Sequence, residues 1–216
     1  MFKRMPDVQQ RLADDVYEQI LLAIVNGQIA PGERLIQEKI AAEINISRTP
    51  VREALLRLEQ EGVLEMQGRK GFAIRQVSED EVVQVYGARE AIEGYSAFWL
   101  AANRTPERLA AVAAKVADER AEHSPDVEVE FRLNKAIHRT IVEQTGNKVL
   151  LDLFDTLWGH GVSLWLFAGT LCNQPPPDPD WHMVLFGVIS TGTPEEAQAA
   201  MIAHIREGLE RQLKGL

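Results

Sequence analysis

The sequence has little cysteine and no long apolar segment that is free of interruptions. Cys172 is the only cysteine among 216 residues, so neither an intramolecular disulfide nor a cysteine-based zinc cluster can form. Such sparing use of cysteine is typical of a reducing compartment, and we expect a cytoplasmic protein. The chain turns polar at once and does not open with the basic-then-apolar pattern of a secretory signal. Residues 156–177 lack acidic and basic side chains, but glycines and prolines interrupt them, so we expect a buried helix and no membrane span.

An excess of basic residues is also absent, since the formal net charge is -9. Residues 1–76 hold 11 basic and 11 acidic side chains, so the whole negative excess belongs to residues 77–216. Within the balanced part, residues 66–76 carry Arg69, Lys70 and Arg75 and no acidic residue. A local basic feature can contact phosphates while an acidic remainder keeps the protein soluble, so the net charge does not exclude nucleic-acid binding.

The first 76 residues predict three helices followed by a β-hairpin. Apolar residues recur every four positions from residue 12 to 24 and from 36 to 44, and a third helix follows at about 48–62. From residue 64 the period changes to two, and a Gly-Arg-Lys-Gly turn separates two short strands. This order has the proportions of a winged helix-turn-helix, although the pattern alone also fits a small α+β domain of another function.

The remainder of the chain is expected to be all helical, with helices at about 79–103, 106–122, 126–144, 147–170, 180–191 and 194–213. Ser78 with Glu81, and Thr193 with Glu196, have the spacing of capping boxes. Thr105, Ser124 and Thr193 each precede a proline, which suits the first helical position. We therefore expect a mostly α fold: a winged helix-turn-helix in residues 1–76 and an antiparallel helical bundle in residues 77–216.

Two sets of motifs resemble one family. The run S-R-T-P-V-R-E-A-L, which starts at Ser47, is followed by R-L-E-Q-E-G and resembles the recognition helix of the GntR family of bacterial transcription regulators. The helical part is similar to the FCD ligand-binding domain of the FadR subfamily. Its matching pieces are R-x-x-I-E from Arg89, N-x-x-x-H from Asn134, T-G-N-K-V-L from Thr145, and the histidines at 182 and 204. The resemblance implies a transcription regulator and not an enzyme.

The DNA-binding prediction centres on the third helix. Arg48 and Arg52 lie four positions apart and so share a face, and an arginine can pair bidentately with guanine in the major groove. The alternative is that both are solvated, with Arg52 paired to nearby acidic residues. The candidate contacts to double-stranded DNA are Arg34, Ser47, Arg48, Thr49, Arg52, Arg69 and Lys70. The sequence departs from the family pattern at Glu38, where many FCD-type sequences have a basic residue that contacts DNA.

The bundle carries a candidate metal site. Asn134 and His138 lie one turn apart, and an antiparallel helix pair would bring His182 and His204 to comparable heights on either side of the turn. Three neutral imidazoles suit zinc, nickel or another divalent transition metal. The alternative is that these histidines are separate, hydrogen-bonded core residues. The family resemblance implies a metal at these positions, usually with aspartate where this chain has Asn134.

Arg89 is the candidate receptor for an anionic effector. A buried guanidinium needs a carboxylate partner, and Glu93 at i+4 is the partner that would make Arg89 purely structural. A metal together with an arginine would suit a small organic acid.

The expected function is therefore a ligand-responsive regulator, with the repressor form the commoner in the family, acting as a homodimer on a pseudo-palindromic operator. A histidine-ligated metalloenzyme is the alternative, but the sequence offers no clear general base for it. A protein-interaction module would leave the two arginines unexplained.

Overall fold

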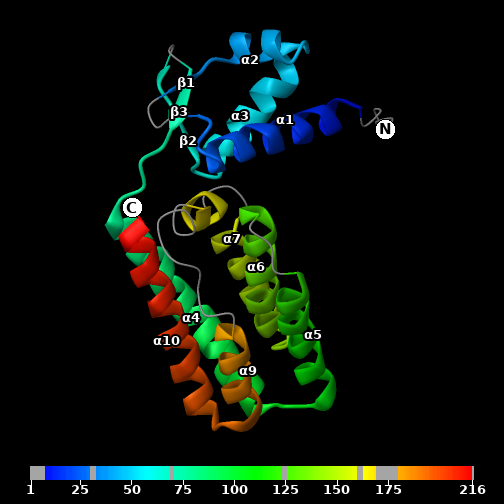
Figure 1. Cartoon of the computed structure of the whole chain (residues 1–216), viewed down its shortest axis with the longest axis vertical. Helices are drawn as coiled ribbons and strands as arrows, with labels where there is room; N and C mark the ends of the chain where they lie inside the picture. The colour runs from blue at the N-terminus through cyan, green and yellow to red at the C-terminus, as the bar shows by residue number, and fades with distance from the viewer. Residues whose placement is uncertain are drawn as a thin grey trace. The chain divides into compact units, whose positions relative to one another are not determined.

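The computed structural model describes residues 8–29, 33–68, 71–122, 126–159, 163–168 and 180–215. The chain divides into two compact units, the first built chiefly from residues up to Gln76 and the second chiefly from Val77 onward (Figure 1). The mostly α fold class predicted from the sequence is confirmed.

The first unit combines three helices with a small antiparallel sheet. Its elements are α1 Val8–Val25, β1 Arg34–Leu35, α2 Gln37–Glu43, α3 Arg48–Gln60, β2 Leu64–Met66 and β3 Phe72–Ile74. The sheet order is β1-β3-β2, so the predicted hairpin of β2 and β3 is confirmed. The sequence analysis missed β1, because a strand of two residues contains no alternation that could reveal it.

Packing in the first unit fixes which face of α3 is exposed. Val51, Leu55 and Leu58 have no exposed area and face the core, and α1 packs against them. Arg48 and Arg52 lie on the exposed face. Burying the apolar stripe of an amphipathic helix therefore leaves its two arginines in solvent.

The second unit is a helical bundle. Its helices are α4 Glu79–Ala102, α5 Pro106–Glu122, α6 Val127–Glu143, α7 Lys148–Leu157, α9 Trp181–Thr191 and α10 Pro194–Gly215. Residues 163–168 are also helical, and of these only 166–168 are grouped with the second unit. Both predicted capping boxes form: Ser78 Oγ accepts from the Glu81 N–H, and Thr193 Oγ1 accepts from the Glu196 N–H. Helices α4 and α10 run side by side (Figure 1).

One predicted helix boundary is wrong. The helix expected at 147–170 ends at Leu157, where Lys135 of α6 donates to the carbonyl oxygen of Trp158 at 2.8 Å. The helix expected at 126–144 is α6, and its N-cap is Asp126, whose side chain accepts from two backbone N–H groups; the predicted cap Ser124 lies outside the described residues. In the described part of the chain, no helix has both the length and the apolar character needed to cross a membrane.

The apolar core of the bundle is formed by five helices. Buried residues of α4, α5, α6, α9 and α10 form one cluster, which includes Leu100, Val112, Ile141, Ile189 and Met201. The bundle also buries a carboxylate and three imidazoles: Glu93, His138, His182 and His204. Buried ionisable groups are costly unless they are paired or bind a ligand, so this cluster is the first candidate for a site.

Candidate metal centre and nucleic-acid interface

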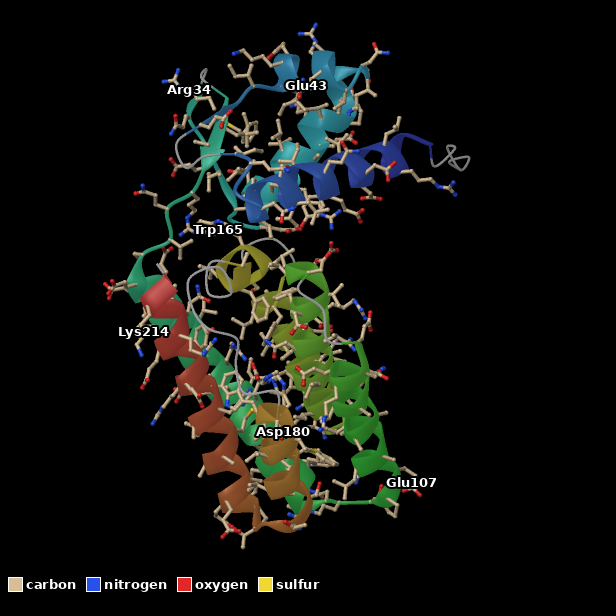
Figure 2. All side chains as sticks on the ribbon, in the orientation of Figure 1. Arg34, Glu43, Glu107, Trp165, Asp180 and Lys214 are labelled. Carbon is tan, nitrogen blue, oxygen red and sulfur yellow. The ribbon has the colours of Figure 1, made fainter. Side chains whose placement is uncertain are left out.

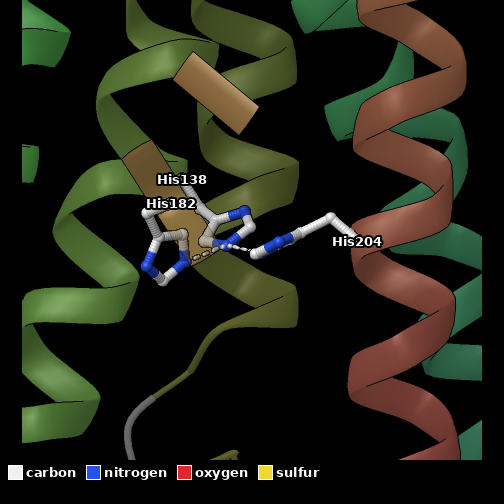
Figure 3. A group of neighbouring side chains, drawn as sticks. All are labelled: His138, His182 and His204. Carbon is white, nitrogen blue, oxygen red and sulfur yellow. Dashed lines mark hydrogen bonds between the residues drawn. The ribbon is translucent and has the colours of Figure 1, made fainter. Parts of the chain in front are cut away.

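Three histidines from three helices converge inside the bundle. His138 of α6, His182 of α9 and His204 of α10 point their rings toward one another (Figure 3). Nε2 of His138 lies 3.3 Å from Nε2 of His182 and 3.1 Å from Nε2 of His204. The structure therefore brings together the three histidines that the sequence singled out.

Two carboxylates fix the orientation of two of these rings. Glu93 Oε2 of α4 lies 2.6 Å from Nδ1 of His138. Both carboxylate oxygens of Glu119, on α5, lie within 2.9 Å of Nδ1 of His182. An ionised carboxylate only accepts, so in the neutral form of each ring Nδ1 carries the proton and Nε2 presents a lone pair toward the cluster. The sequence analysis did not identify Glu119, and it considered Glu93 only as a partner for Arg89.

The donor set fits a divalent metal ion. His138, His182 and His204 have ligand atoms within 4.8 Å of one another, so they could hold a metal ion. Two nitrogens bound at about 2.0–2.1 Å to a tetrahedral ion lie roughly 3.3 Å apart. The observed Nε2–Nε2 separations of 3.3 and 3.1 Å match this value. For His138 and His182, whose Nδ1 atoms face carboxylates, two lone pairs at that distance would repel each other, and a cation between them would remove the repulsion.

Burial keeps the imidazoles in the form that binds metals. Desolvation lowers the pKa of His138, and the nearby Glu93 carboxylate only partly offsets this effect. Desolvation, together with the neighbouring histidines, lowers the pKa of His204 well below its ordinary value of 6.5. Both rings are therefore neutral at neutral pH, as metal coordination requires.

His204 differs from the other two histidines in the surroundings of Nδ1. This atom is buried and has no hydrogen-bond partner among the described residues. The ring of Trp181 covers His204, with centroids 4.1 Å apart. Metal coordination through Nε2 would place the proton on Nδ1, which would then be a donor in need of an acceptor.

Asn134, the fourth candidate metal ligand, has a weaker link to this cluster. Asn134 lies one turn before His138 and is half-buried, but no hydrogen bond joins its amide to the histidines in the part of α6 and its neighbours that the structure describes. Ligation by Asn134 therefore stays a prediction.

Arg89 pairs with Glu93, which was the structural alternative. Its Nε donates to Glu93 Oε1 at 2.8 Å, and its guanidinium lies 4.2 Å from the ring centroid of Trp158. Trp158 Nε1 also donates to Glu93 Oε1 at 3.1 Å. Burial alone would raise the pKa of Glu93, but Arg89 and His138 hold it at about 2. One ionised carboxylate thus connects the candidate effector residue with a candidate metal ligand.

The N-terminus of α3 presents the predicted DNA-contacting groups to solvent. Ser47, Arg48, Thr49 and Arg52 are all exposed. Ser47 is the N-cap residue of α3, yet its side chain makes no capping hydrogen bond. Its hydroxyl lies, with the N–H groups of the first turn, at a helix N-terminus, which favours anions.

The first unit also exposes Arg34, and it places an acidic residue beside Arg48. Arg34 is exposed on β1, opposite Ala73 of β3 (Figure 2). Arg48 has an acidic partner, since its Nη1 lies 3.5 Å from Glu38 Oε1 of α2; Arg52 has none among the residues that the structure describes. The predicted wing residues Arg69 and Lys70 lie outside the described residues.

A winged helix-turn-helix unit joined to an all-helical unit with a buried polar cluster defines a DNA-binding transcriptional regulator. Residues 12–74 match the model of the bacterial regulatory proteins of the gntR family, and residues 84–207 match the FCD domain. The chain belongs to the GntR family of bacterial transcription regulators and carries an FCD domain.

Relatives and solved structures agree with this assignment. The chain is 27% identical over 197 residues to a "Probable D-xylose utilization operon transcriptional repressor" of Paenarthrobacter nicotinovorans, a match that covers 90% of this chain and 85% of that protein. It is 30% identical over 141 residues to the HTH-type transcriptional regulator YdhC of Bacillus subtilis (strain 168), which covers 64% of this chain and 63% of YdhC.

The structure of McbR/YncC from E. coli shares the fold, with a TM-score of 0.66 at 19% identity over 94% of this chain and 97% of that one. A GntR regulator from Rhodococcus sp. RHA1 superposes with a TM-score of 0.70 at 18% identity, over 93% and 97% of the two chains. The family and these relatives are regulators of transcription, so the metalloenzyme alternative is wrong.

Proposed function

We propose that this regulator is a homodimeric repressor whose helical domain binds a divalent metal ion and a small organic acid. The observation that carries the proposal is the convergence of three buried imidazoles, two of them oriented by carboxylates. Neutral nitrogen ligands favour zinc or nickel among the divalent ions. The orientation of two rings by carboxylates supports a metal site over a set of separate core histidines.

His138, His182 and His204 would hold the metal, and Asn134 is the proposed additional ligand. Glu93 and Glu119 would keep the first two rings in the productive orientation. The bound ion would supply a positive centre to which a carboxylate of the effector can bind.

Arg89 would contribute to effector binding through its positive charge beside the metal. Its contact with Glu93 satisfies only part of the guanidinium, which has five N–H donors. We infer that an effector carboxylate would meet a guanidinium already held in place by Glu93 and by the Trp158 ring. A pre-positioned cation costs less entropy on binding than a free side chain.

The DNA interface would comprise Arg34, Ser47, Arg48, Thr49, Arg52, Arg69 and Lys70. One winged helix reads only a half-site, so two copies would bind a pseudo-palindromic operator in the bacterial cytoplasm. Residues 1–76 would form the DNA-binding domain and residues 77–216 the domain for effector binding and dimerisation. Metal and effector would alter the spacing of the two DNA-binding domains, a coupling typically worth 1–3 kcal/mol.

The metal proposal is tested by metal analysis of the purified full-length protein and of two variants, His138→Ala and His204→Ala. We expect close to one ion per wild-type chain and a large loss in each variant. Metal binding can also be followed by tryptophan fluorescence. The ring centroid of Trp158 lies 5.5 Å from that of His138, and the ring centroid of Trp181 lies 4.1 Å from that of His204. Stoichiometric metal in both variants would refute the assignment of these ligands.

The DNA proposal is tested with Arg52→Ala. We expect this variant to lose sequence preference while it keeps the fold, because Arg52 is exposed and supports no buried group. Each lost bidentate contact to guanine weakens discrimination by about 1–3 kcal/mol. Selection from a random duplex library measures the preference, and unaltered selectivity would count against the recognition-helix assignment.

A further inference from the structure

The first turn of α2 contacts the first residue of α3 in two ways. Glu38 Oε1 lies 3.5 Å from Nη1 of Arg48, and Gln37 Nε2 donates to the backbone oxygen of Arg48 at 3.2 Å. Both members of the ion pair are well exposed, with 67% of the Arg48 side chain and 61% of the Glu38 side chain accessible. A carboxylate therefore lies within the surface that α3 would present to DNA.

We propose that Glu38 is a specificity-determining residue, which lowers the affinity of the regulator for duplexes of arbitrary sequence by holding Arg48 back from phosphates. The inference rests on the proposed DNA interface. Membership of the family does not define the balance between specific and non-specific DNA binding.

The exposure of the pair makes Arg48 exchangeable. An exposed ion pair contributes little to stability, so Arg48 can leave Glu38 when DNA offers a better partner. The carboxylate nevertheless remains beside the position that the Arg48 guanidinium occupies in the structure. A phosphate near Arg48 would meet a like charge at close range, and like charges repel.

The repulsion acts unequally on the two kinds of DNA contact. Phosphate oxygens carry a full negative charge, whereas guanine O6 and N7 are neutral acceptors. Glu38 therefore weakens a phosphate contact of Arg48 more than a base contact. Phosphate contacts supply essentially all of the non-specific affinity, so the penalty falls mainly on random sequences.

Arg52 provides the internal comparison. It is exposed on the same face of α3, one turn from Arg48, and it has no ion-pair partner among the described residues. The two arginine side chains thus differ in the presence of an ion-paired carboxylate. The effect of Glu38 should depend on Arg48.

The test compares Glu38→Gln with wild type in the full-length protein. The probes are a random-sequence duplex and a duplex selected by the wild-type protein from a random library. We expect affinity for the random duplex to rise by about threefold per protomer, because the variant removes a negative charge close to a phosphate that Arg48 contacts. The slope of log affinity against log salt should become steeper by about 0.9 for each additional phosphate that the variant neutralises. Affinity for the selected duplex should rise less, so that the ratio of the two falls.

Glu43→Gln is the matched control. Glu43 is exposed at the other end of α2, and its replacement changes the net charge by the same amount (Figure 2). If Glu38→Gln behaves like Glu43→Gln, the effect is one of net charge and the inference is wrong. In an Arg48→Gln background, the change in salt slope should disappear, and its persistence would also overturn the inference.

Two other outcomes can be told apart from these. A loss of affinity confined to the selected duplex in Glu38→Gln, with altered preference at a cytosine, would make Glu38 a direct base contact and overturn the inference. Failure of the wild-type protein to bind any duplex would instead overturn the proposed DNA interface on which the inference rests.

Discussion

At the scale of single residues, the bundle cluster depends on hydrogen bonds that set the tautomer of each histidine. The Glu93 carboxylate accepts from His138 Nδ1, and the Glu119 carboxylate accepts from His182 Nδ1. The two carboxylates differ in what else they support. Glu93 also pairs with the buried Arg89, whereas the structure shows Glu119 bonded to His182 and 17% exposed. Glu119 is therefore the cleaner residue for testing orientation alone.

We predict that Glu119→Ala lowers metal affinity by about 10- to 100-fold, because loss of the acceptor lets the His182 ring rotate and lowers its basicity. Competition with a chromophoric chelator measures the affinity. Glu119→Gln should lose less, since an amide oxygen can still accept from Nδ1. Glu122→Ala, one turn along the exposed side of α5, is the control and should bind like wild type; equal affinity in all four proteins would contradict the role of Glu119.

At the scale of elements, the close approach of β1 and β3 depends on one glycine. Gly71 has a φ of +93°, and a Cβ at this position would lie 2.6 Å from the backbone oxygen of Leu35. An alanine residue rarely adopts such a φ, and the contact between its Cβ and Leu35 would push β1 away from β3. Because β1 carries Arg34, this glycine also positions a proposed DNA contact.

We predict that Gly71→Ala lowers the free energy of unfolding by more than about 2 kcal/mol, through both the positive φ and the clash. Gly68→Ala is the matched control. Its φ is also positive, +60°, but no atom lies within 4 Å of the added Cβ. It should cost only about 1–2 kcal/mol. Denaturation with urea, followed by circular dichroism, measures both values, and equal losses would show that the contact with Leu35 has no effect.

At the scale of the whole molecule, stability should depend on pH through the buried cluster. The pKa of His138 and that of His204 are lowered by desolvation, so the unfolded chain binds more protons than the folded one below the ordinary value of 6.5. Stability then rises with pH in this range and falls on acidification. Glu93, with its pKa lowered from 4.5 to about 2, adds a further loss below 4.5.

We predict that, with metal removed by a chelator, the free energy of unfolding decreases from pH 7 to pH 5. A His204→Asn variant should show a shallower decrease, because one of the titrating groups is gone. Restoring zinc should steepen the decrease, since protons compete with the metal for the imidazoles. A flat profile from pH 7 to pH 5 in the wild-type protein would contradict the neutral state of these histidines.

The proposed homodimer needs an apolar surface that two copies can share. Helix α4 exposes an apolar stripe with a four-residue period, made of Val83, Gly87, Ala91 and Tyr95. We predict that Tyr95→Glu converts the proposed homodimer to monomers, because a charge would be buried between copies. Val149→Glu on α7 is the control, since Val149 is 67% exposed on another helix. Sedimentation velocity measures the oligomeric state, and a dimeric Tyr95→Glu protein would exclude this stripe from the interface.

The sequence by itself determined most of the helices, the hairpin and the family. Helical periodicity, capping boxes and the S-R-T-P-V-R-E-A-L run are local signals, and each describes how a segment behaves before it meets another. Helix spacing, together with the family resemblance, identified the three histidines and the two arginines. The local signals failed where a boundary depends on a contact, as at Leu157, whose helix end is capped by a lysine from α6.

Only the tertiary structure decided which groups face one another. Glu93 and His138 are 45 positions apart, and Glu119 and His182 are 63 apart, so no local pattern relates them. The same holds for Glu38, whose neighbour Arg48 lies on the next helix. Periodicity shows which face of a helix is buried, but the partner across that face is chosen by how helices pack, and packing depends on the whole chain at once.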